Sequence, residues 1–376
     1  MEKSGSSEGT QQPKKLVKVW VDGCFDMMHF GHANALRQAK ALGDYLIVGV
    51  HSDAEVLKNK GPPVMKEEER YAQVAACKWV DEVVPDAPYI TQLEVMDQHD
   101  ADFVVHGDDV TTAADGSDCY AKAKAVGRYR EVARTTGVST TDIVKRMLEC
   151  TKEHYVVDAG SILEGSPMVP SMSEGTNKGS PPTGIAKFIA TSQKISKFSN
   201  GKEPKPTDKI VYIDGAWDLF HVGHLKILEK AKALGNFLIV GVLDDLVVNR
   251  YKKANFPIMN LYERVLSVLS CKYVDEVVIA APEKITKEFI DGLNIQCVVH
   301  GKDPVEPCED GSDPYEVAKQ LGLYKEIDSG SDMTTTVIIN RIKENRKMYE
   351  ERNKRKEVKG EEEKRVLSQQ GEATSS

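Results

Sequence analysis

Residues 18–32 read KVWVDGCFDMMHFGH, and residues 210–224 repeat the pattern as IVYIDGAWDLFHVGH. Each copy begins with a run of β-branched and aromatic residues, which is typical of a buried strand. An Asp-Gly pair follows, and two histidines three positions apart end the pattern. This order predicts a strand, a tight turn and the first turn of a helix, twice in one chain.

The repetition extends far beyond this pattern. Further segments match in the same order, and the offset drifts only from 192 (18 to 210) to 195 (146 to 341). The clearest pairs are AKALGDYLIVGVHSD (39–53) with AKALGNFLIVGVLDD (231–245), ERYAQVAACKWVDEVV (69–84) with ERVLSVLSCKYVDEVV (263–278), and FVVHGDDV (103–110) with CVVHGKDP (297–304). A repeat of this length indicates two duplicated domains, not a solenoid.

Each half alternates strand-like runs with segments of helical spacing. In the first half the runs are KLVKVWV, YLIVGV, EVVP, FVVHG and a weaker YREVA, and the helical segments are ANALRQAKAL, EEERYAQVAACK, ITQLEVMDQ and YAKAKAVG. Strand–helix alternation with nearly continuous apolar strands indicates a parallel sheet covered on both faces. We therefore predict an α/β protein with two tandem Rossmann-like domains, each a doubly wound parallel sheet.

The predicted organisation has five parts. They are a disordered leader (1–15), a first domain (16–150), a linker (151–206), a second domain (207–345) and a charged tail (346–376). The linker is rich in Gly, Ser and Pro, and it ends in IAKFIATSQKISKF, whose helical spacing predicts a helix packed on the second domain. The tail is almost all charge, so we expect a solvated helix that frays.

Composition limits the classes of function. The 376 residues are 40 % hydrophobic and 29 % charged, with a formal net charge of −8. The acidic balance argues against a nucleic-acid surface, and no apolar run approaches the roughly 18 residues of a membrane span. Seven cysteines show no CxxC pair, which favours reduced thiols over a metal site. We expect a cytoplasmic protein with no nucleic-acid partner and at most peripheral membrane association, for example at the endoplasmic reticulum.

The two histidines of the first copy carry the chemistry. His29 and His32 are expected between a strand and a helix, at the carboxyl edge of the sheet where open α/β folds bind ligands. Gly31 permits close approach of a phosphate, and the free N–H groups of the helix start attract anions. Metal binding is the weaker alternative, because it would require a third ligand, usually with carboxylates or thiolates close by in the sequence. We expect a phosphate site and no metal held by the protein.

Three motifs together resemble the cytidylyltransferase family of phospholipid synthesis, and within it the tandem-domain branch that acts on ethanolamine phosphate. They are G-x-(F/W)-D-x-x-H-x-G-H, KGPPVMKEEERY (60–71) and RTTGVSTTD (134–142). The histidine motif alone is shared with class I aminoacyl-tRNA synthetases, whereas the third motif is narrower. The resemblance covers residues 16–148 strongly and residues 208–345 more loosely.

The resemblance implies that a phosphate oxygen of phosphoethanolamine attacks the α-phosphorus of CTP and that pyrophosphate leaves. Positioning and charge stabilisation supply most of such catalysis, with Mg²⁺ carried on the triphosphate. Implied catalytic residues are His29, His32, Lys60 and Arg134. Implied CTP-binding residues are Gly23, Phe25, Gly31, Arg70, Thr135, Gly137, Ser139, Thr140 and Thr141. A structural ion pair is the alternative role for Arg70.

The ammonium end of phosphoethanolamine calls for carboxylates and aromatic faces. The resemblance implies Asp22, Tyr89, Asp108 and Tyr120 as the residues that bind it. Threonines follow the paired aspartates in HGDDVTT, where choline-specific relatives carry an aromatic residue. Fewer aromatic walls favour a primary ammonium over a trimethylammonium, so phosphocholine is the alternative substrate. More distant alternatives are another nucleotidyltransferase and a non-catalytic nucleotide-binding protein.

The second copy keeps His221 and His224 but loses much of their context. Aligned at offset 195, Arg134 corresponds to Ser329 and Gly137 to Asp332. An acidic residue in place of part of a cationic phosphate grip repels a triphosphate. We expect the second domain to be a weak or inactive nucleotide site that pairs with the first domain inside one chain. The sequence leaves homodimerisation open.

Overall fold

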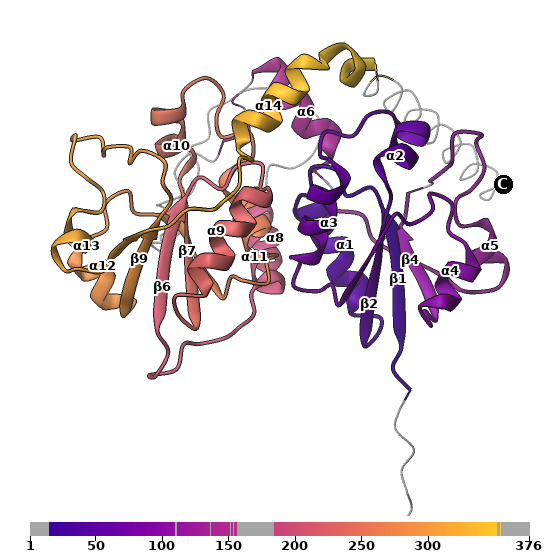
Figure 1. The fold of residues 1–376 in the computed structure, drawn as a ribbon, viewed down its shortest axis with the longest axis horizontal. Helices are drawn as coiled ribbons and strands as arrows, with labels where there is room; N and C mark the ends of the chain where they lie inside the picture. Colours follow the sequence, from indigo (N-terminus) through magenta and orange to yellow (C-terminus); the bar gives the residue numbers. More distant parts are fainter. Residues whose placement is uncertain are drawn as a thin grey trace, which may run out of the picture.

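A computed structural model describes residues 15–109, 111–135, 137–150, 152, 154–155, 184–351 and 354. Two five-stranded sheets lie side by side, each covered by helices (Figure 1). Most of the predicted leader and linker, and the tail beyond residue 354, lie outside the described residues.

All strand pairs in both sheets are parallel. The first sheet has the order β3-β2-β1-β4-β5 and the second the order β10-β9-β6-β7-β8. The strands are β1 Lys18–Gly23, β2 Tyr45–Val50, β3 Glu82–Pro85, β4 Phe103–Gly107, β5 Tyr129–Val132, β6 Ile210–Gly215, β7 Phe237–Leu243, β8 Glu276–Ala281, β9 Ile295–His300 and β10 Tyr324–Glu326. The predicted fold class of two doubly wound parallel sheets is confirmed.

The helices follow the strands as expected, each domain using the same sequence of elements. In the first domain they are α1 Phe30–Lys40, α2 Asp53–Lys60, α3 Glu67–Ala75, α4 Leu93–Gln98, α5 Ala121–Ala125 and α6 Thr140–Glu149. Then come α8 Gly184–Phe198, α9 Val222–Lys232, α10 Asp245–Lys252, α11 Leu261–Leu269, α12 Lys287–Gly292, α13 Glu316–Gln320 and α14 Thr335–Glu344.

The pleat of β1 divides the first domain into two apolar layers. Val19 and Val21 pack with Leu36 of α1 and Val74 of α3, whereas Trp20 faces the layer formed by α4 and α5. The strand is buried on both faces, which explains its unbroken apolar run. The chain runs from β1 to β2 and β3 on one side and then crosses back from β3 to β4 on the other side of β1, so the carboxyl end of β1 lies at the switch point where such folds bind ligands.

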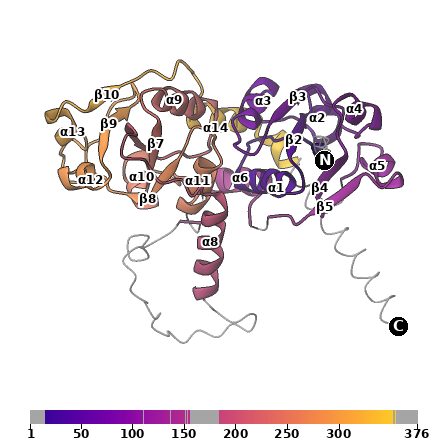
Figure 2. The same cartoon turned by 90° about the horizontal axis from the view of Figure 1, so that it is seen from below.

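One apolar core continues across the boundary between the domains. It joins Met27, Phe30 and Val138 of the first domain to Leu219 and Leu225 of the second. Figure 2 shows α1 and α3 of the first domain facing α9 and α11 of the second, between the two sheets. The predicted pairing of the two domains within one chain is therefore observed.

The interface has pseudo-two-fold symmetry. Arg146 forms a bidentate ion pair with Glu263 of the second domain, at 2.6 and 2.9 Å. The corresponding Arg341 forms the reciprocal pair with Glu69 of the first domain, at 2.7 and 2.8 Å. Near the centre, an isolated antiparallel bridge places Cys77 opposite Cys271, and the seven cysteines are all free thiols.

Two segments outside the predicted domain cores pack against both domains. The predicted linker helix is α8, which contacts α11 as expected, and its Phe198 also meets Trp79 of the first domain edge to face at 4.9 Å. Residues 346–351 are helical again after Asn345. The expectation that the whole tail is solvated is wrong at Tyr349, whose side chain is 2 % exposed against the first domain.

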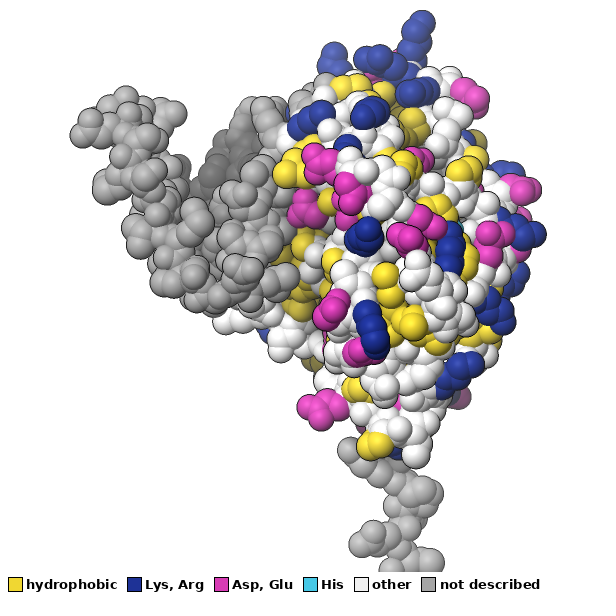
Figure 3. Space-filling view, turned by 90° about the vertical axis from the view of Figure 1, so that its left-hand side faces the viewer, with side chains coloured by type: hydrophobic (Ala, Val, Ile, Leu, Met, Phe, Trp, Pro, Cys, Tyr) yellow, Lys and Arg dark blue, Asp and Glu magenta, His cyan; other side chains and the backbone are white. Residues whose placement is uncertain are grey.

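Charged side chains of both signs lie on the outer face of the second domain. On the face of the second domain drawn in Figure 3, Asp and Glu side chains are interspersed with Lys and Arg over the middle, and Lys and Arg side chains gather at the top. Among the helices that the structure describes, none combines the length and the apolar content needed to cross a bilayer.

Candidate active site

The two histidines of the first copy lie where β1 passes into α1. His29 is the N-cap residue of α1, and its Nδ1 accepts the Gly31 N–H at 3.1 Å. His32 Nδ1 accepts the His29 N–H at 3.4 Å. The two rings stack with their centroids 4.0 Å apart.

These backbone bonds fix the tautomer of both rings. A backbone N–H needs an acceptor, so each neutral imidazole carries its proton on Nε2. His29 and His32 therefore present two Nε2–H donors from neighbouring rings. Gly31 makes this packing possible, because a side-chain Cβ there would approach the His29 ring to 2.9 Å. Upstream, Phe25 adopts a left-handed conformation (φ 50°), and its ring lies 5.7 Å from that of His32.

A second helix begins beside the first. Ser139 is the N-cap of α6 and accepts the Asp142 N–H at 3.1 Å. Thr140 Oγ1 donates to the Asp26 carbonyl at 3.0 Å, which fastens the start of α6 to the turn before His29. The N-termini of α1 and α6, with the positive ends of their helix dipoles, thus converge, as a polyanion requires.

The segment that connects β5 to α6, here called the strap, is attached to α1. Thr135 accepts a hydrogen bond from Asn34 of α1 at 2.9 Å. Gly137 has φ 88°, a left-handed conformation that favours glycine. Thr141, in the first turn of α6, is half-buried.

Arg134 is exposed at the rim of the site. Its backbone N–H donates to Asp108 at 3.0 Å, and its guanidinium lies 3.4 Å from Asp109. Because the side chain is 49 % exposed, this ion pair is screened and the guanidinium can exchange partners. Asp108, a predicted phosphoethanolamine ligand, is joined here to a predicted phosphate-binding arginine.

Lys60 is the last residue of α2 and is followed by Gly61, whose φ of 94° ends the helix. The ammonium is directed into the site, with Nζ 5.7 Å from the centroid of the Tyr89 ring. The pKa of Lys60 is raised, chiefly by the nearby Cys24 thiol and then by Tyr89 and Asp109, so the side chain is cationic at neutral pH. The structure thus brings the predicted phosphate lysine together with a predicted substrate tyrosine.

Arg70 is fully buried in α3. It donates to the Cys24 carbonyl at 2.6 Å and pairs with Asp53 at 2.9 Å, while its Nε has no hydrogen-bond partner among the described residues. The alternative role, a structural ion pair, is observed, and it holds the turn after β1; the role of Arg70 in CTP binding stays a prediction.

Asp22 lies at the bottom of the site, at the end of β1. Its buried carboxylate accepts hydrogen bonds from Trp20 at 2.9 Å, Thr91 at 2.5 Å and Tyr120 at 2.8 Å. The predicted pair Asp22 and Tyr120 is thus in direct contact. Burial and the neighbouring Asp22 charge raise the pKa of Tyr120 well above its usual value, so the hydroxyl remains a donor.

Tyr89 forms one wall above this carboxylate. It is 4 % exposed, its hydroxyl has no hydrogen-bond partner in the described part of the chain, and its ring lies 4.9 Å from that of His51. Gly23, the next residue of β1, allows the Phe25 ring to approach closely.

Sequence reasoning missed several residues of this pocket. His51, immediately after β2, is buried, and burial lowers its pKa. His106, at the end of β4, packs on Tyr120 with ring centroids 4.8 Å apart, and Thr91 binds Asp22. Their place at or near the carboxyl ends of strands was the available signal, since such positions converge in a parallel sheet.

Comparison with known proteins agrees with this geometry. The family model described as Cytidylyltransferase-like matches residues 20–146 and 212–359, which together make up most of the chain. The chain belongs to the cytidylyltransferase-like family. The resemblance read from the motifs is confirmed, and the chain contains the family domain twice.

Curated relatives in the cytidylyltransferase-like family match nearly end to end. The chain is 55 % identical to the ethanolamine-phosphate cytidylyltransferase of Dictyostelium discoideum, over 93 % of this chain and 97 % of the relative. It is 49 % identical to the mouse (Mus musculus) protein of the same name, over 95 % and 93 %. Choline-phosphate cytidylyltransferase 2 of Arabidopsis thaliana is 44 % identical over only 39 % of this chain and 48 % of the relative.

The second cytidylyltransferase-like domain keeps the scaffold of the first. Asp218 accepts the N–H groups of Ile258 and Met259 at 2.8 and 2.9 Å, as Asp26 accepts those of Val64 and Met65. Its histidines also stack, with centroids 3.8 Å apart. Burial lowers the pKa of His221 to about 3, and that of His224 is lowered by the same cause.

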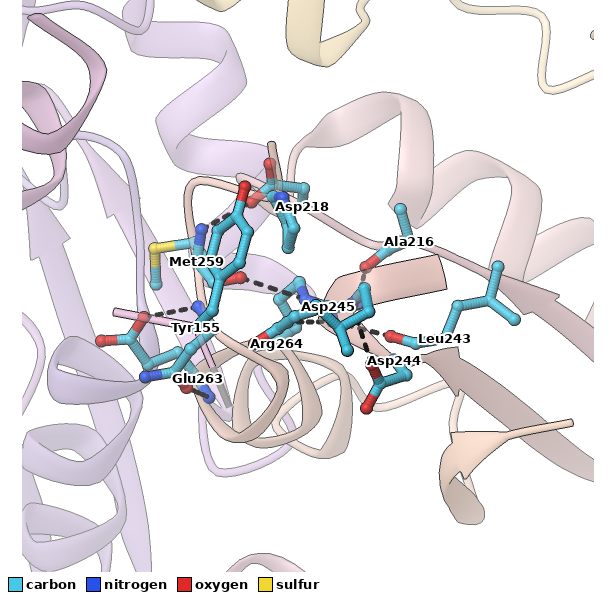
Figure 4. Close-up of polar contacts among 12 residues, drawn as sticks. Tyr155, Ala216, Asp218, Leu243, Asp244, Asp245, Met259, Glu263 and Arg264 are labelled. Atoms are coloured by element: carbon cyan, nitrogen blue, oxygen red, sulfur yellow. Dashed lines mark hydrogen bonds and ion pairs between the residues drawn. The ribbon is translucent and has the colours of Figure 1, made fainter. Parts of the chain in front are cut away.

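The buried arginine of the second cytidylyltransferase-like domain is held by hydrogen bonds within the protein. Arg264, the counterpart of Arg70, donates to three backbone carbonyls and to Asp245 (Figure 4). The carbonyls belong to Ala216, Leu243 and Met259. Unlike Arg70, whose Nε lacks a partner, each guanidinium nitrogen of Arg264 has a hydrogen-bond partner within the described part of the protein.

The phosphate side of this second domain is also altered. A Cβ on Gly223 would overlap the carbonyl oxygen of Met333, whereas at Gly31 it would meet only the Val138 side chain at 3.0 Å on that side. A backbone carbonyl therefore presses on the first turn of α9, where an anion would need N–H donors. Lys302, in place of Asp108, pairs with Asp328 at 3.0 Å.

Proposed function

We propose that the chain transfers the cytidylyl group of CTP to phosphoethanolamine, giving CDP-ethanolamine and pyrophosphate for phosphatidylethanolamine synthesis. The observation that carries this proposal is the match, over more than 90 % of both chains, to two relatives named for this activity. Phosphocholine as the acceptor has less support, because the choline-named relative matches only 39 % of the chain.

The first domain has the groups for an in-line displacement. A phosphate oxygen of phosphoethanolamine forms a bond to the α-phosphorus of CTP, and the bond from that phosphorus to the bridging oxygen of the β-phosphate breaks. The Nε2–H groups of His29 and His32 would donate to the phosphate oxygens as their charge grows in the transition state. Lys60 and Arg134 would neutralise the departing pyrophosphate, and the N-termini of α1 and α6 would hold it.

The pocket around Asp22 suits a primary ammonium. A buried carboxylate, the Tyr120 hydroxyl and the unpartnered Tyr89 hydroxyl supply polar contacts, while the Tyr89 ring supplies one aromatic face. Desolvating an ammonium is favourable only when acceptors replace its water. Asp22 supplies the compensating charge at the bottom of the pocket.

CTP would enter with Mg²⁺ on its phosphates. Among the residues that the structure describes, no three His, Cys, Asp or Glu side chains are grouped for metal binding. Mg²⁺ commonly retains waters and phosphate oxygens as ligands, so a substrate-borne ion needs no protein cage. The ion would screen triphosphate charge while the protein positions it.

The second domain would serve pairing and positioning, with at most weak nucleotide binding. The Met333 carbonyl over α9 and the Lys302–Asp328 pair support this role. We place the enzyme in the cytoplasm. Peripheral contact with the endoplasmic reticulum and assembly into a homodimer are compatible with this proposal.

Product identification tests the reaction. Purified protein is incubated with CTP, Mg²⁺ and either phosphoethanolamine or an equimolar mixture with phosphocholine, and products are separated by mass. We expect CDP-ethanolamine in large excess, loss of turnover by more than about a thousandfold in a His29→Ala, His32→Ala double variant, and retention of most turnover in a His221→Ala, His224→Ala variant. Predominant CDP-choline, or ATP replacing CTP, would refute the proposal.

A further inference from the structure

Lys60 is followed by a short segment that ends at Met65, and we call residues 60–65 the Lys60 arm. Beyond a hinge at Gly61 this arm is stiff. Gly61 ends α2 with φ 94°, and Pro62 and Pro63 follow with φ fixed by their rings. Val64 and Met65 then donate their N–H groups to the Asp26 carboxylate at 3.0 and 2.9 Å. The position of Lys60 therefore depends on where the Pro62–Met65 segment is anchored.

The second domain holds the other side of the same segment. Arg341 of α14 donates to the Val64 carbonyl at 3.3 Å while its guanidinium is fixed by Glu69. Tyr349 donates its hydroxyl to the Pro63 carbonyl at 3.1 Å from a fully buried position. In Figure 1, α14 and the helical residues after it cross the top of the molecule from the second domain toward α2.

Equivalent contacts run in the other direction, from the first domain to the corresponding loop of the second domain. Arg146 donates to the Ile258 carbonyl at 3.3 Å, and Tyr155 donates to the Phe256 carbonyl. Positions 146 and 155 correspond to 341 and 349 at offsets of 195 and 194. The loop they hold belongs to the second domain, where the phosphate site is obstructed.

We propose that Arg341 and Tyr349 are positioning residues for the catalytic lysine of the first domain. The inference rests on the proposed cytidylyl transfer and gives the second domain a defined part in it. Anchored on one side by Asp26 and on the other by Arg341 and Tyr349, the Pro62–Met65 segment sets the reach of Lys60 over the triphosphate. Small displacements of such a charge are costly, since a misplacement of about 1 Å can reduce rates about a hundredfold.

Matched variants separate positioning from general support of the interface. Arg341→Met and Arg146→Met each remove one bidentate ion pair and one carbonyl contact between the domains. Tyr349→Phe and Tyr155→Phe each remove one hydroxyl contact with a backbone carbonyl, and Tyr155→Phe also removes an acceptor for Asn249. Neither Arg146 nor Tyr155 contacts the Lys60 arm in the described structure, so these two variants are the controls.

The measurement is steady-state kinetics on the full chain with CTP and phosphoethanolamine, beside thermal unfolding of each variant. We expect Arg341→Met to lower kcat/KM for CTP by about tenfold or more, with KM for phosphoethanolamine changed less than about twofold. Tyr349→Phe should act in the same direction by about threefold. Arg146→Met should lower the melting temperature as much as Arg341→Met yet leave kcat/KM for CTP within about twofold.

A Lys60→Ala background gives an independent test. If Arg341 acts through Lys60, Arg341→Met should cause no further loss of kcat/KM for CTP once the lysine is gone. An equal further loss in that background, or equal kinetic loss in the Arg341→Met and Arg146→Met variants, overturns the inference. Wild-type protein without CDP-ethanolamine production would instead refute the proposed function, so the two failures are distinguishable.

Discussion

His29 and His221 occupy equivalent N-cap positions but have different surroundings. His29 Nδ1 accepts a backbone N–H, whereas His221 Nδ1 is buried with no hydrogen-bond partner among the described residues. Lys252 also lies near enough to oppose protonation of His221. The His29 ring is therefore held so that Nε2–H is its donor, whereas the His221 ring only fills space in the core.

This difference predicts that His221 makes the protein acid-sensitive. Its pKa is about 3 in the folded chain and about 6.5 when unfolded, so only the unfolded state gains a proton between these values. The stability contributed by the neutral ring is full above pH 6.5 and declines as the pH falls toward 3, by roughly 1.4 kcal/mol per pH unit. Denaturant unfolding between pH 7 and 4.5 should show a shallower dependence for His221→Gln, and identical slopes would contradict the assignment.

Thr91 is expected to affect the amine substrate alone. Thr91→Val keeps the side-chain shape but removes a 2.5 Å hydrogen bond to Asp22, leaving a buried carboxylate lone pair unsatisfied. The Asp22 carboxylate then loses one of the three hydrogen bonds that orient it in the amine pocket. We expect KM for phosphoethanolamine to rise about threefold to tenfold with KM for CTP unchanged, and Thr91→Ser to behave as wild type. A change confined to CTP would remove Thr91 from the amine pocket.

At the scale of elements, the same strand–turn–helix unit starts an open helix in one copy and a helix faced by a backbone carbonyl in the other. The starts of α1 and α6 converge in the first domain, and those of α9 and α14 converge in the second. The two copies differ in the strap, which is the segment that connects β5 to α6 in the first domain and β10 to α14 in the second. In the second copy it brings the Met333 carbonyl onto α9 and lacks the arginine.

A single CTP per chain is therefore expected. Calorimetric titration with a non-hydrolysable CTP analogue and Mg²⁺ should give a stoichiometry near one. Ser329→Arg restores the missing cation of the second domain but not the space for a phosphate, so the stoichiometry should stay near one. His29→Ala with His32→Ala should lower the affinity of the site in the first domain. A second equivalent of bound nucleotide would contradict this prediction, because the second domain would then bind nucleotide despite the Met333 carbonyl.

Much of the site could be predicted because local sequence determines it. The N-cap position of His29, the need for Gly31 and the start of α6 at Ser139 all follow from short-range rules. The pocket partners Thr91, His51 and His106 come from separate strand ends, and their contacts depend on the final sheet order. Tyr349 could not be predicted, because a lone tyrosine in a charged segment shows no apolar stripe and its burial arises from the other domain.

At the scale of the whole molecule, the two domains share one core and exchange reciprocal ion pairs. The apolar cluster that includes Phe30 and Val138 continues into Leu225 and Ile338 without interruption. Interfaces of this kind couple the stabilities of the domains.

We therefore expect one cooperative unfolding transition for the full chain. Circular dichroism and intrinsic fluorescence should report the same midpoint in urea. A fragment ending at residue 150 exposes the shared core and should melt at least about 10 °C lower or fail to fold. Two separated transitions, or a fragment as stable as the full chain, would contradict a shared core.

Cys77 and Cys271 face each other at the centre of this arrangement, as a residue faces its own copy on the axis of a homodimer. In a dimer of identical subunits, every substitution strikes both sites at once, so neither site can lose its chemistry alone. Fusion into one chain removes that constraint. One half is free to give up turnover while it keeps the contacts that hold its neighbour, and the unequal histidine pairs described above are what the division of labour that we propose would leave.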